Sequence, residues 1–183
     1  MITQTAQFMG INPEALYGAY LSSKEHAAMT ADNRPAVYYR PGEGELAHGE
    51  EGDELQAFGF TGPDGVTRYS LTARIIQLVP KKVIVLTWKN QAWNLALDPN
   101  EVTDMDSMVV LTFQKNPAGA EIQLVQANVP EYKVHIPDTG ETGSLHSVVN
   151  THWNLLYWEP MKRYFRRLSM QKRQAPNSGP DRA

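Results

Sequence analysis

The chain has 183 residues, of which 42% are hydrophobic and 20% charged, and its formal net charge is −3. This composition fits one globular domain with a full hydrophobic core, and the small negative charge gives no reason to expect a nucleic-acid partner. The absence of cysteine excludes disulfides, thiol catalysis and thiolate metal sites. No signal peptide and no run of membrane-spanning length is visible, so we expect a cytoplasmic protein.

The N-terminal part predicts one strand followed by two short helices. Residues 2–8 alternate as a strand does. Asn12-Pro13-Glu14 then combines an N-cap, a proline at the first helical position and an acidic first turn. Ser22 or Ser23 is expected to cap a second short helix, which should end before Asn33.

A brief strand at 35–39 is expected to lead into the most polar segment of the domain, residues 41–53. Glycine and acidic residues dominate this segment, so we expect an exposed loop. A cation site is the sharper alternative, but the acidic residues lack the alternating spacing of a calcium loop.

From residue 54 onward the hydrophobic period changes to two. Strands are expected at 54–60, 67–78, 82–88, 107–115 and 120–127. The Pro-Asp-Gly sequence at 63–65 is a hairpin signal, because proline presets one dihedral angle and glycine accepts the left-handed one. Short turns between successive strands indicate an antiparallel meander. Residues 89–106 and 128–143 are interpreted as a loop and a linker.

Residues 145–168 form the longest segment with helical periodicity. Its apolar stripe consists of Val149, Trp153, Leu156, Tyr157, Met161, Tyr164, Phe165 and Leu168. Pro160 lies in the middle, where it removes a backbone donor and clashes with the preceding turn, so we expect a kink there. An antiparallel sheet with one apolar face must be covered, and this is the only long amphipathic element available to cover it.

Basic residues gather near the C-terminus: Lys162, Arg163, Arg166, Arg167, Lys172 and Arg173. We interpret them as complementing the helix dipole and staying solvated, in preference to an RNA- or membrane-binding patch. Residues 171–183 contain no large apolar residue to bury and are expected to form a disordered tail. The expected fold is therefore α+β, with one domain at 1–170 whose curved antiparallel sheet wraps around the C-terminal helix.

Five stretches carry a family resemblance: residues 11–17, 52–55, 73–88, 107–113 and 157–164. The strand-turn-strand ending in Thr87-Trp88 and the Tyr-Trp-Glu-Pro sequence at 157–160 are the more specific ones. Together they are similar to the START-like superfamily (SRPBCC, helix-grip fold), and within it to the domain homologous to the activator of heat-shock protein 90 ATPase. Where relatives often have a histidine at the end of the last strand, this chain has Gln126.

The resemblance implies a hydrophobic cavity between the sheet and the C-terminal helix. Many members of the superfamily bind lipids, hormones or polyketides there, so a small hydrophobic ligand is the expected partner. Two alternatives stay open. One is a cyclase- or hydrolase-type enzyme that uses the same cavity, with His152 or a carboxylate as general acid or base. The other is a chaperone-associated protein that stimulates a heat-shock ATPase.

The candidate ligand-binding residues are aromatic side chains near the expected cavity, together with two polar ones. They are Phe58, Phe60, Tyr69, Trp88, Trp93, Gln126, His152, Trp153 and Tyr157. Plain core packing is the alternative for the aromatic residues. By strict alternation Ile122, Leu124 and Gln126 point to one side, and if that side is inward, the Gln126 amide needs a partner from the protein or from a ligand.

No catalytic residue, metal site or cofactor is assigned. The five histidines, His26, His48, His135, His146 and His152, do not pair at helical metal-ligand spacing. No nucleophile elbow, phosphate loop or dinucleotide fingerprint is present. The net charge and the absence of a long apolar run lead us to expect neither a nucleic-acid partner nor insertion into a membrane. The sequence leaves the oligomeric state open.

Overall fold

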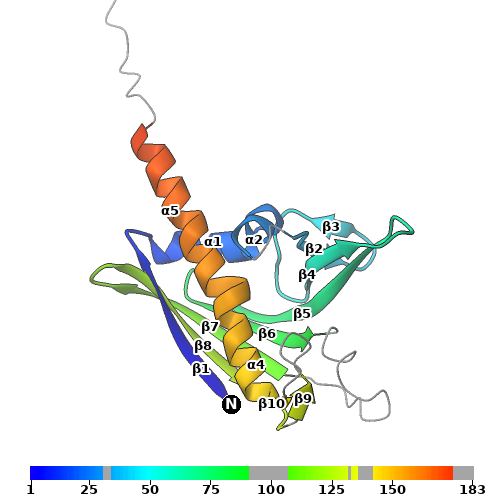
Figure 1. The fold of residues 1–183 in the computed structure, drawn as a ribbon. Helices are drawn as coiled ribbons and strands as arrows, with labels where there is room; N and C mark the ends of the chain where they lie inside the picture. The colour runs from blue at the N-terminus through cyan, green and yellow to red at the C-terminus, as the bar shows by residue number, and fades with distance from the viewer. Residues whose placement is uncertain (31–33, 91–106, 132, 136–141, 175–183) are drawn as a thin grey trace, which may run out of the picture.

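The computed structural model describes residues 1–30, 34–90, 107–131, 133–135 and 142–174. Eight strands form one antiparallel sheet in the order β1-β8-β7-β6-β5-β4-β2-β3. Their bounds are β1 Ile2–Met9, β2 Val37–Arg40, β3 Gly44–Leu46, β4 Glu54–Thr61, β5 Thr67–Val79, β6 Val83–Asn90, β7 Ser107–Asn116 and β8 Gly119–Ala127. Figure 1 shows this sheet curving around the long C-terminal helix, which confirms the predicted fold class.

Two short helices follow the first strand, α1 (Pro13–Leu21) and α2 (Ser23–Met29). The side chain of Asn12 caps the first by accepting the Glu14 N–H at 2.9 Å. Ser22 caps the second by accepting the Glu25 N–H at 3.3 Å. Ser23, the other cap candidate, instead bonds the Leu46 carbonyl and so ties α2 to β3.

The long helix consists of α4 (Leu145–His152), a π-helical turn η2 (Trp153–Trp158) and α5 (Glu159–Gln174). In an α-helix the ring of Pro160 would clash with the carbonyl of residue 156. The chain widens into a π-helical turn directly before the proline, where the Glu159 N–H bonds the carbonyl of Asn154, five residues back. We expected a kink at Pro160. The structure instead has an added residue in the turn before it, and the three segments run on as one helix (Figure 1).

The interior lies between the concave face of the sheet and this helix. Along β8 the buried residues alternate with exposed ones, so that Ile122, Leu124 and Gln126 are buried whereas Gln123 and Val125 are exposed. The predicted inward face of this strand is therefore confirmed. Each large side chain buried here contributes about 1.5–3 kcal/mol of transfer free energy.

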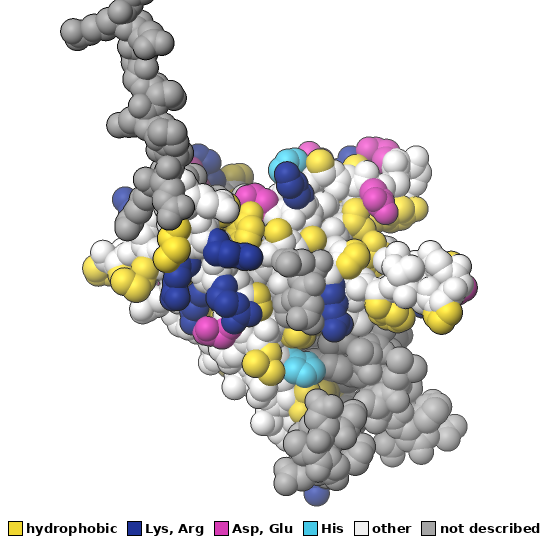
Figure 2. Space-filling model, turned by 45° about the horizontal axis from the view of Figure 1, so that its top comes forward, with side chains coloured by type: hydrophobic (Ala, Val, Ile, Leu, Met, Phe, Trp, Pro, Cys, Tyr) yellow, Lys and Arg dark blue, Asp and Glu magenta, His cyan; other side chains and the backbone are white. Residues whose placement is uncertain are grey.

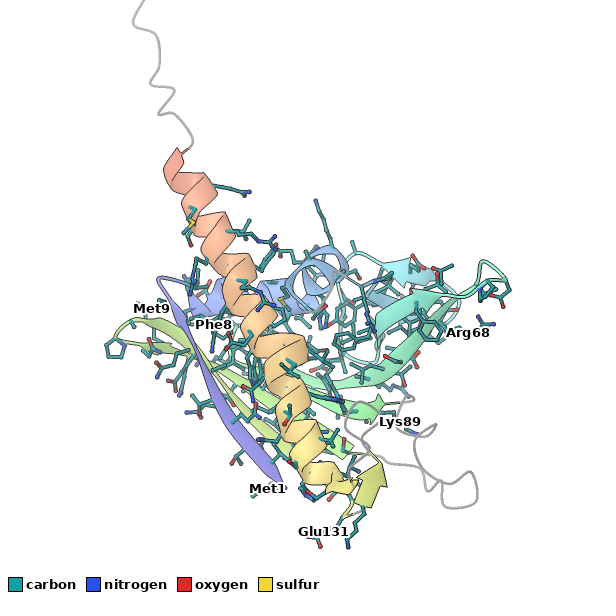
Figure 3. The ribbon with its side chains drawn as sticks, in the orientation of Figure 1. Met1, Phe8, Met9, Arg68, Lys89 and Glu131 are labelled. Carbon is teal, nitrogen blue, oxygen red and sulfur yellow. The ribbon has the colours of Figure 1, made fainter. Side chains whose placement is uncertain are left out.

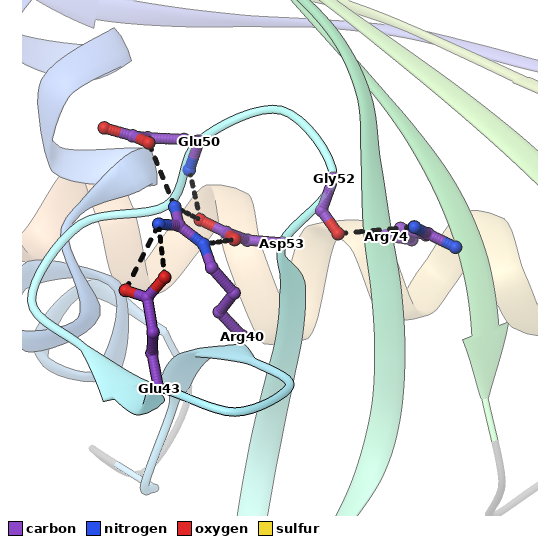
Figure 4. A network of polar contacts seen from close by, with 6 residues as sticks. All are labelled: Arg40, Glu43, Glu50, Gly52, Asp53 and Arg74. Carbon is purple, nitrogen blue, oxygen red and sulfur yellow. Dashed lines mark hydrogen bonds and ion pairs between the residues drawn. The ribbon is translucent and has the colours of Figure 1, made fainter.

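The segment 41–53 is more ordered than the exposed loop expected from its composition. It contains the strand β3, and Asp53 is only 1% exposed. The Arg40 guanidinium donates two hydrogen bonds to Asp53, of 2.6 and 2.9 Å, and also contacts Glu43 and Glu50 (Figure 4). Three of the five acidic residues of this segment thus surround one arginine, which a composition argument does not reveal.

Two other expected boundaries differ from the structure. The predicted linker 128–143 contains a short antiparallel pair, β9 (Lys133–His135) with β10 (Thr142–Ser144). The expected tail from 171 begins inside α5, which continues to Gln174, and residues 175–183 lie outside those described. Among the described helices, none combines the length and apolar character needed to cross a membrane.

Candidate functional site

A small pocket lies between the long helix and strands β4 to β6. Eight residues line it: Phe58, Leu71, Trp88, Val149, His152, Trp153, Leu156 and Tyr157. Its cavity volume is about 20 Å³, which is room for a single water molecule. The aromatic side chains therefore almost fill the space beneath the helix, as the dense cluster of sticks there in Figure 3 illustrates.

The aromatic rings of the pocket contact one another directly. The ring centroids of Trp88 and Trp153 are 4.7 Å apart, and those of Trp153 and Tyr157 are 4.8 Å apart. Phe58 meets Tyr157 edge-on at 5.5 Å. An edge-on pair such as Phe58 and Tyr157 adds about 0.5–1.5 kcal/mol beyond the buried area.

The π-helical turn places three aromatic side chains on the buried side of the helix. In an α-helix residue i+5 is turned well away from residue i, whereas in a turn closed by i→i+5 bonds it returns close to the same face. Trp153, Tyr157 and Trp158 are accordingly all about 2% exposed. Trp158 stacks on Trp153 with ring centroids 5.2 Å apart.

Phe58 reaches the pocket through an unusual backbone conformation. Its φ is +54°, a left-handed value that bulky side chains rarely adopt. Alternation along β4 places Ala57 and Gly59 inward and would place Phe58 outward, but Phe58 is only 5% exposed. The left-handed residue thus interrupts the alternation and turns the ring against Tyr157.

Gln126 holds Trp153 from the sheet side. Its side-chain oxygen accepts the indole N–H of Trp153 at 2.8 Å. Its amide nitrogen donates to the Ser107 hydroxyl at 2.9 Å, and this hydroxyl donates to the Trp88 carbonyl at 3.0 Å. The partner that a buried amide requires is therefore supplied by the protein.

Gln4 on β1 performs the same task for the second tryptophan of the helix. Its side-chain oxygen accepts the indole N–H of Trp158. Its amide nitrogen donates to the carbonyl of Asn150 at 2.7 Å. Two glutamines on neighbouring strands thus anchor the π-helical turn.

A buried polar cluster lies beside Tyr157, and sequence reasoning missed it. His26 Nδ1 lies 2.8 Å from the Tyr20 carbonyl, which can only accept, so Nδ1 carries the proton. Nε2 then accepts a hydrogen bond from the Tyr157 hydroxyl at 3.3 Å. Burial lowers the pKa of His26 to about 4, so the ring is neutral near neutral pH. The sequence did contain a signal for this burial. His26 lies four residues after the Ser22 cap, on the same side of α2 as the buried Met29.

Residues 11–166 match the family described as Activator of Hsp90 ATPase homolog 1-like protein. The chain belongs to this family. The family resemblance drawn from the sequence is therefore confirmed, and the matched range includes every residue of the pocket. No curated protein matches the sequence.

Solved structures of similar fold come from several organisms. An HSP90 activator from Plasmodium falciparum is 17% identical with a TM-score of 0.59, and the match covers 90% of this chain and 94% of that one. A protein from Mesorhizobium loti is 16% identical with a TM-score of 0.58, over 91% and 96% of the two chains. A protein from Rhodobacter sphaeroides is 18% identical with a TM-score of 0.54, over 95% and 92%. At these identities the likeness shows the fold alone.

Five of the nine predicted site residues of this family member line the pocket. They are Phe58, Trp88, His152, Trp153 and Tyr157. Gln126 lies behind Trp153 and is 1% exposed. Sequence reasoning did not select Leu71, Val149 and Leu156, although the last two belong to the apolar stripe of the helix.

Two further described residues of the predicted site are not among the pocket lining, and a third predicted residue lies outside the described part of the chain. Phe60 is 51% exposed, because its side chain points outward as the alternation along β4 requires, whereas Phe58 departs from that alternation. Tyr69 is half-buried on β5, opposite Gly59. Trp93 lies outside the described residues.

Besides Tyr157, whose pKa is raised by burial, the pocket lining contains one other titratable group among the described residues, His152. It is half-buried, and burial lowers its pKa. No group of three or more histidine, aspartate or glutamate side chains suited to a metal ion occurs in the described part of the chain. A ligand in this pocket would make apolar and aromatic contacts and would meet one imidazole at the rim.

Proposed function

We propose that this protein binds a small hydrophobic ligand in the pocket beneath its C-terminal helix. Proteins of this fold family commonly bind hydrophobic ligands. The pocket lining is apolar and aromatic with a single polar residue at its rim, which is the usual composition of small-molecule sites.

The observation that carries the proposal is the convergence of two backbone irregularities on one pocket. The π-helical turn supplies Trp153 and Tyr157, and the left-handed residue Phe58 faces them from β4. π-Helical turns occur frequently at functional sites, and a left-handed non-glycine residue costs about 1–3 kcal/mol and persists only where the surroundings enforce it. Pro160 accounts for the place of the π-helical turn in the helix, and both irregularities turn aromatic rings toward the same pocket.

Ligand entry needs a rearrangement, because sites for drug-sized ligands enclose about 300–1,000 Å³ and this pocket has about 20 Å³. Trp153 is held by Gln126, and Tyr157 is held by His26. Leu156 is half-buried at the rim and aliphatic, so it can rotate outward without breaking a hydrogen bond. We infer that Leu156 opens the pocket and that the ligand inserts between the ring faces.

The test is titration with a naphthalene-type fluorescent probe, together with native mass spectrometry of the purified protein. Leu156→Trp places a large ring at the pocket mouth and is expected to weaken probe binding by about tenfold or more, equivalent to ~1.4 kcal/mol. Leu155→Trp is the matched control, because Leu155 is the preceding residue of the same turn, is 59% exposed and does not line the pocket. Equal affinities for both variants, or no probe binding and no retained ligand mass, would overturn the proposal.

A further inference from the structure

A larger hollow lies at the other end of the helix, between α5 and the end of β1. Nine residues line it: Gln7, Phe8, Met9, Ile11, Lys162, Phe165, Arg166, Ser169 and Met170. Its volume is about 470 Å³, within the range of small-molecule sites. We call it the α5 groove. It shares no residue with the pocket beneath Trp153 and Tyr157.

The floor of the α5 groove is apolar and its edges are exposed. Phe8 is 2% exposed and Phe165 is 6% exposed, with their rings edge-on at 6.3 Å. Met9 and Met170 are 81% and 54% exposed, and Figure 3 shows Phe8 and Met9 where β1 ends beside α5. Methionine side chains are flexible and polarizable and adapt to the shape of an apolar ligand.

Two cations stand on the helix side of the groove, one turn apart. Lys162 pairs with Glu159 at 2.8 Å, but both side chains are more than one-third exposed, and such a pair is weak. Arg166 is exposed. The hydrogen bond from Lys162 lowers the pKa of the Glu159 carboxyl, and the charge of Arg166 lowers it further. Arg163 and Arg167 are exposed next to them. Figure 2 shows basic side chains gathered on this face beside hydrophobic ones.

The charge of the groove is local, since the whole chain carries a net charge of −3. Among the described residues, no acidic side chain lines the groove. An apolar floor with cations along one wall complements a molecule that has an alkyl chain and an anionic head. A groove of this volume accommodates one such chain.

We propose that the α5 groove is a second binding site, for a single-chain anionic amphiphile of the fatty-acid type. The carboxylate contacts Arg166 and Lys162, and the alkyl chain lies on Phe8 and Phe165 between the two exposed methionines. Because the guanidinium offers a planar fork of donors that matches a carboxylate, Arg166 is the principal head-group contact.

The experiment uses the full chain with ¹³C-labelled methionine methyl groups, titrated with decanoate below its micelle concentration. The methyl signals of Met9 and Met170 are expected to shift together and to saturate. Met108 is the internal reference, because it is 42% exposed on β7 and does not line the groove. Decyltrimethylammonium, with the same chain length and the opposite charge, is expected to bind more weakly.

Matched variants test the head-group contact. Arg166→Gln is expected to weaken decanoate binding by about threefold to fivefold, as for an exposed charge pair. Arg163→Gln removes the same charge from a neighbouring exposed residue that does not line the groove, and is expected to change the affinity by less than about twofold. Leu156→Trp is expected to leave decanoate binding unchanged, which separates this site from the pocket beneath the helix.

Several results would overturn the proposal. They are the absence of shifts at Met9 and Met170, equal binding of the cationic amphiphile, and equal losses in Arg166→Gln and Arg163→Gln. Shifts at both methionines that depend on protein concentration without decanoate, with a dimer mass by light scattering, would assign the groove to a second copy of the chain instead.

Discussion

The indole N–H of Trp153 donates a 2.8 Å hydrogen bond to the side chain of Gln126, and so ties the C-terminal helix to the last strand of the meander. Both residues are almost completely buried. A buried amide that lost this partner would retain its full desolvation cost. The bond therefore fixes the position of one of the two tryptophan side chains that line the pocket.

Replacing Gln126 tests this connection. Gln126→Leu leaves the Trp153 indole N–H without an acceptor and the Ser107 hydroxyl without its donor, and is expected to lower the free energy of unfolding by about 1–3 kcal/mol. Urea unfolding followed by circular dichroism measures the loss. Gln123→Leu is the control, because Gln123 lies on the exposed face of the same strand, and it is expected to change stability by less than about 0.5 kcal/mol. Equal effects would mean that the indole bond contributes nothing specific.

Phe58 permits a test of backbone strain. At this position a glycine variant is expected to be more stable than an alanine variant, which is the reverse of the usual order in a strand. Phe58→Gly and Phe58→Ala both remove the ring, but only glycine tolerates the φ of +54° without strain. Phe58→Gly is therefore expected to be more stable than Phe58→Ala by about 1 kcal/mol. Thermal and urea unfolding of both variants provide the comparison.

The control for Phe58 is the same pair of substitutions two residues later. Phe60 is not among the residues with positive φ and is half exposed. Glycine in a strand is normally less stable than alanine by about 0.5–1 kcal/mol, so Phe60→Ala should be the more stable variant there. The same order at both positions would show that the conformation of Phe58 is not strained.

His26 predicts a pH dependence of stability. Burial lowers its pKa from 6.5 to about 4 in the folded chain. Between these values the unfolded chain binds more protons, so stability falls as the pH decreases from about 6.5 to about 4, by up to about 3 kcal/mol. His26→Asn keeps an amide donor for the Tyr20 carbonyl but does not titrate in this range.

The measurement for His26 is the difference in unfolding free energy between the wild type and His26→Asn at each pH. This difference is expected to be largest above pH 6.5 and to shrink toward pH 4. Contributions from other groups, such as the lowered pKa of His152, cancel in the difference. Parallel curves for the two proteins would contradict a buried neutral His26.

Asp53 predicts an effect at lower pH. The Arg40 guanidinium lowers the pKa of this buried carboxyl, so its stabilising contribution is present above pH 4 and is lost as the pH falls through the folded pKa. Asp53→Asn is expected to cost about 1–3 kcal/mol near neutral pH. Asp64→Asn is the control, because its pair with Arg68 is about half exposed, and a much smaller change is expected. Both are measured by urea unfolding at pH 7 and pH 3.

Much of the architecture followed from local patterns in the sequence. The caps at Asn12 and Ser22, the hairpin at 62–65 and the inward face of β8 each depend on a few neighbouring residues, and the structure contains all of them. The family resemblance was also readable from short stretches. Composition misjudged Asp53, because the burial of a carboxyl depends on an arginine thirteen residues away.

The site was only partly predictable, because it too depends on backbone conformation and on contacts between residues far apart in the chain. Alternation alone places Phe58 and Phe60 on one face of β4, and both were expected in the cavity; the left-handed residue sends only Phe58 inward. His26 belongs to the site because it accepts a hydrogen bond from Tyr157, which is 131 residues away in the chain. Neither fact is contained in a window of neighbouring residues.

The sequence by itself determined the order and type of the elements, the family, and the apolar stripe of the C-terminal helix, because hydrophobic period, caps and turn residues act over a few positions. Only the tertiary structure decided how the stripe is used. It showed that Pro160 is accommodated by a π-helical turn, that two glutamines on β1 and β8 anchor the tryptophans of that turn, and that side chains nearly fill the pocket beneath it. These outcomes depend on contacts between residues far apart in the chain, where packing and hydrogen-bond satisfaction override local preference.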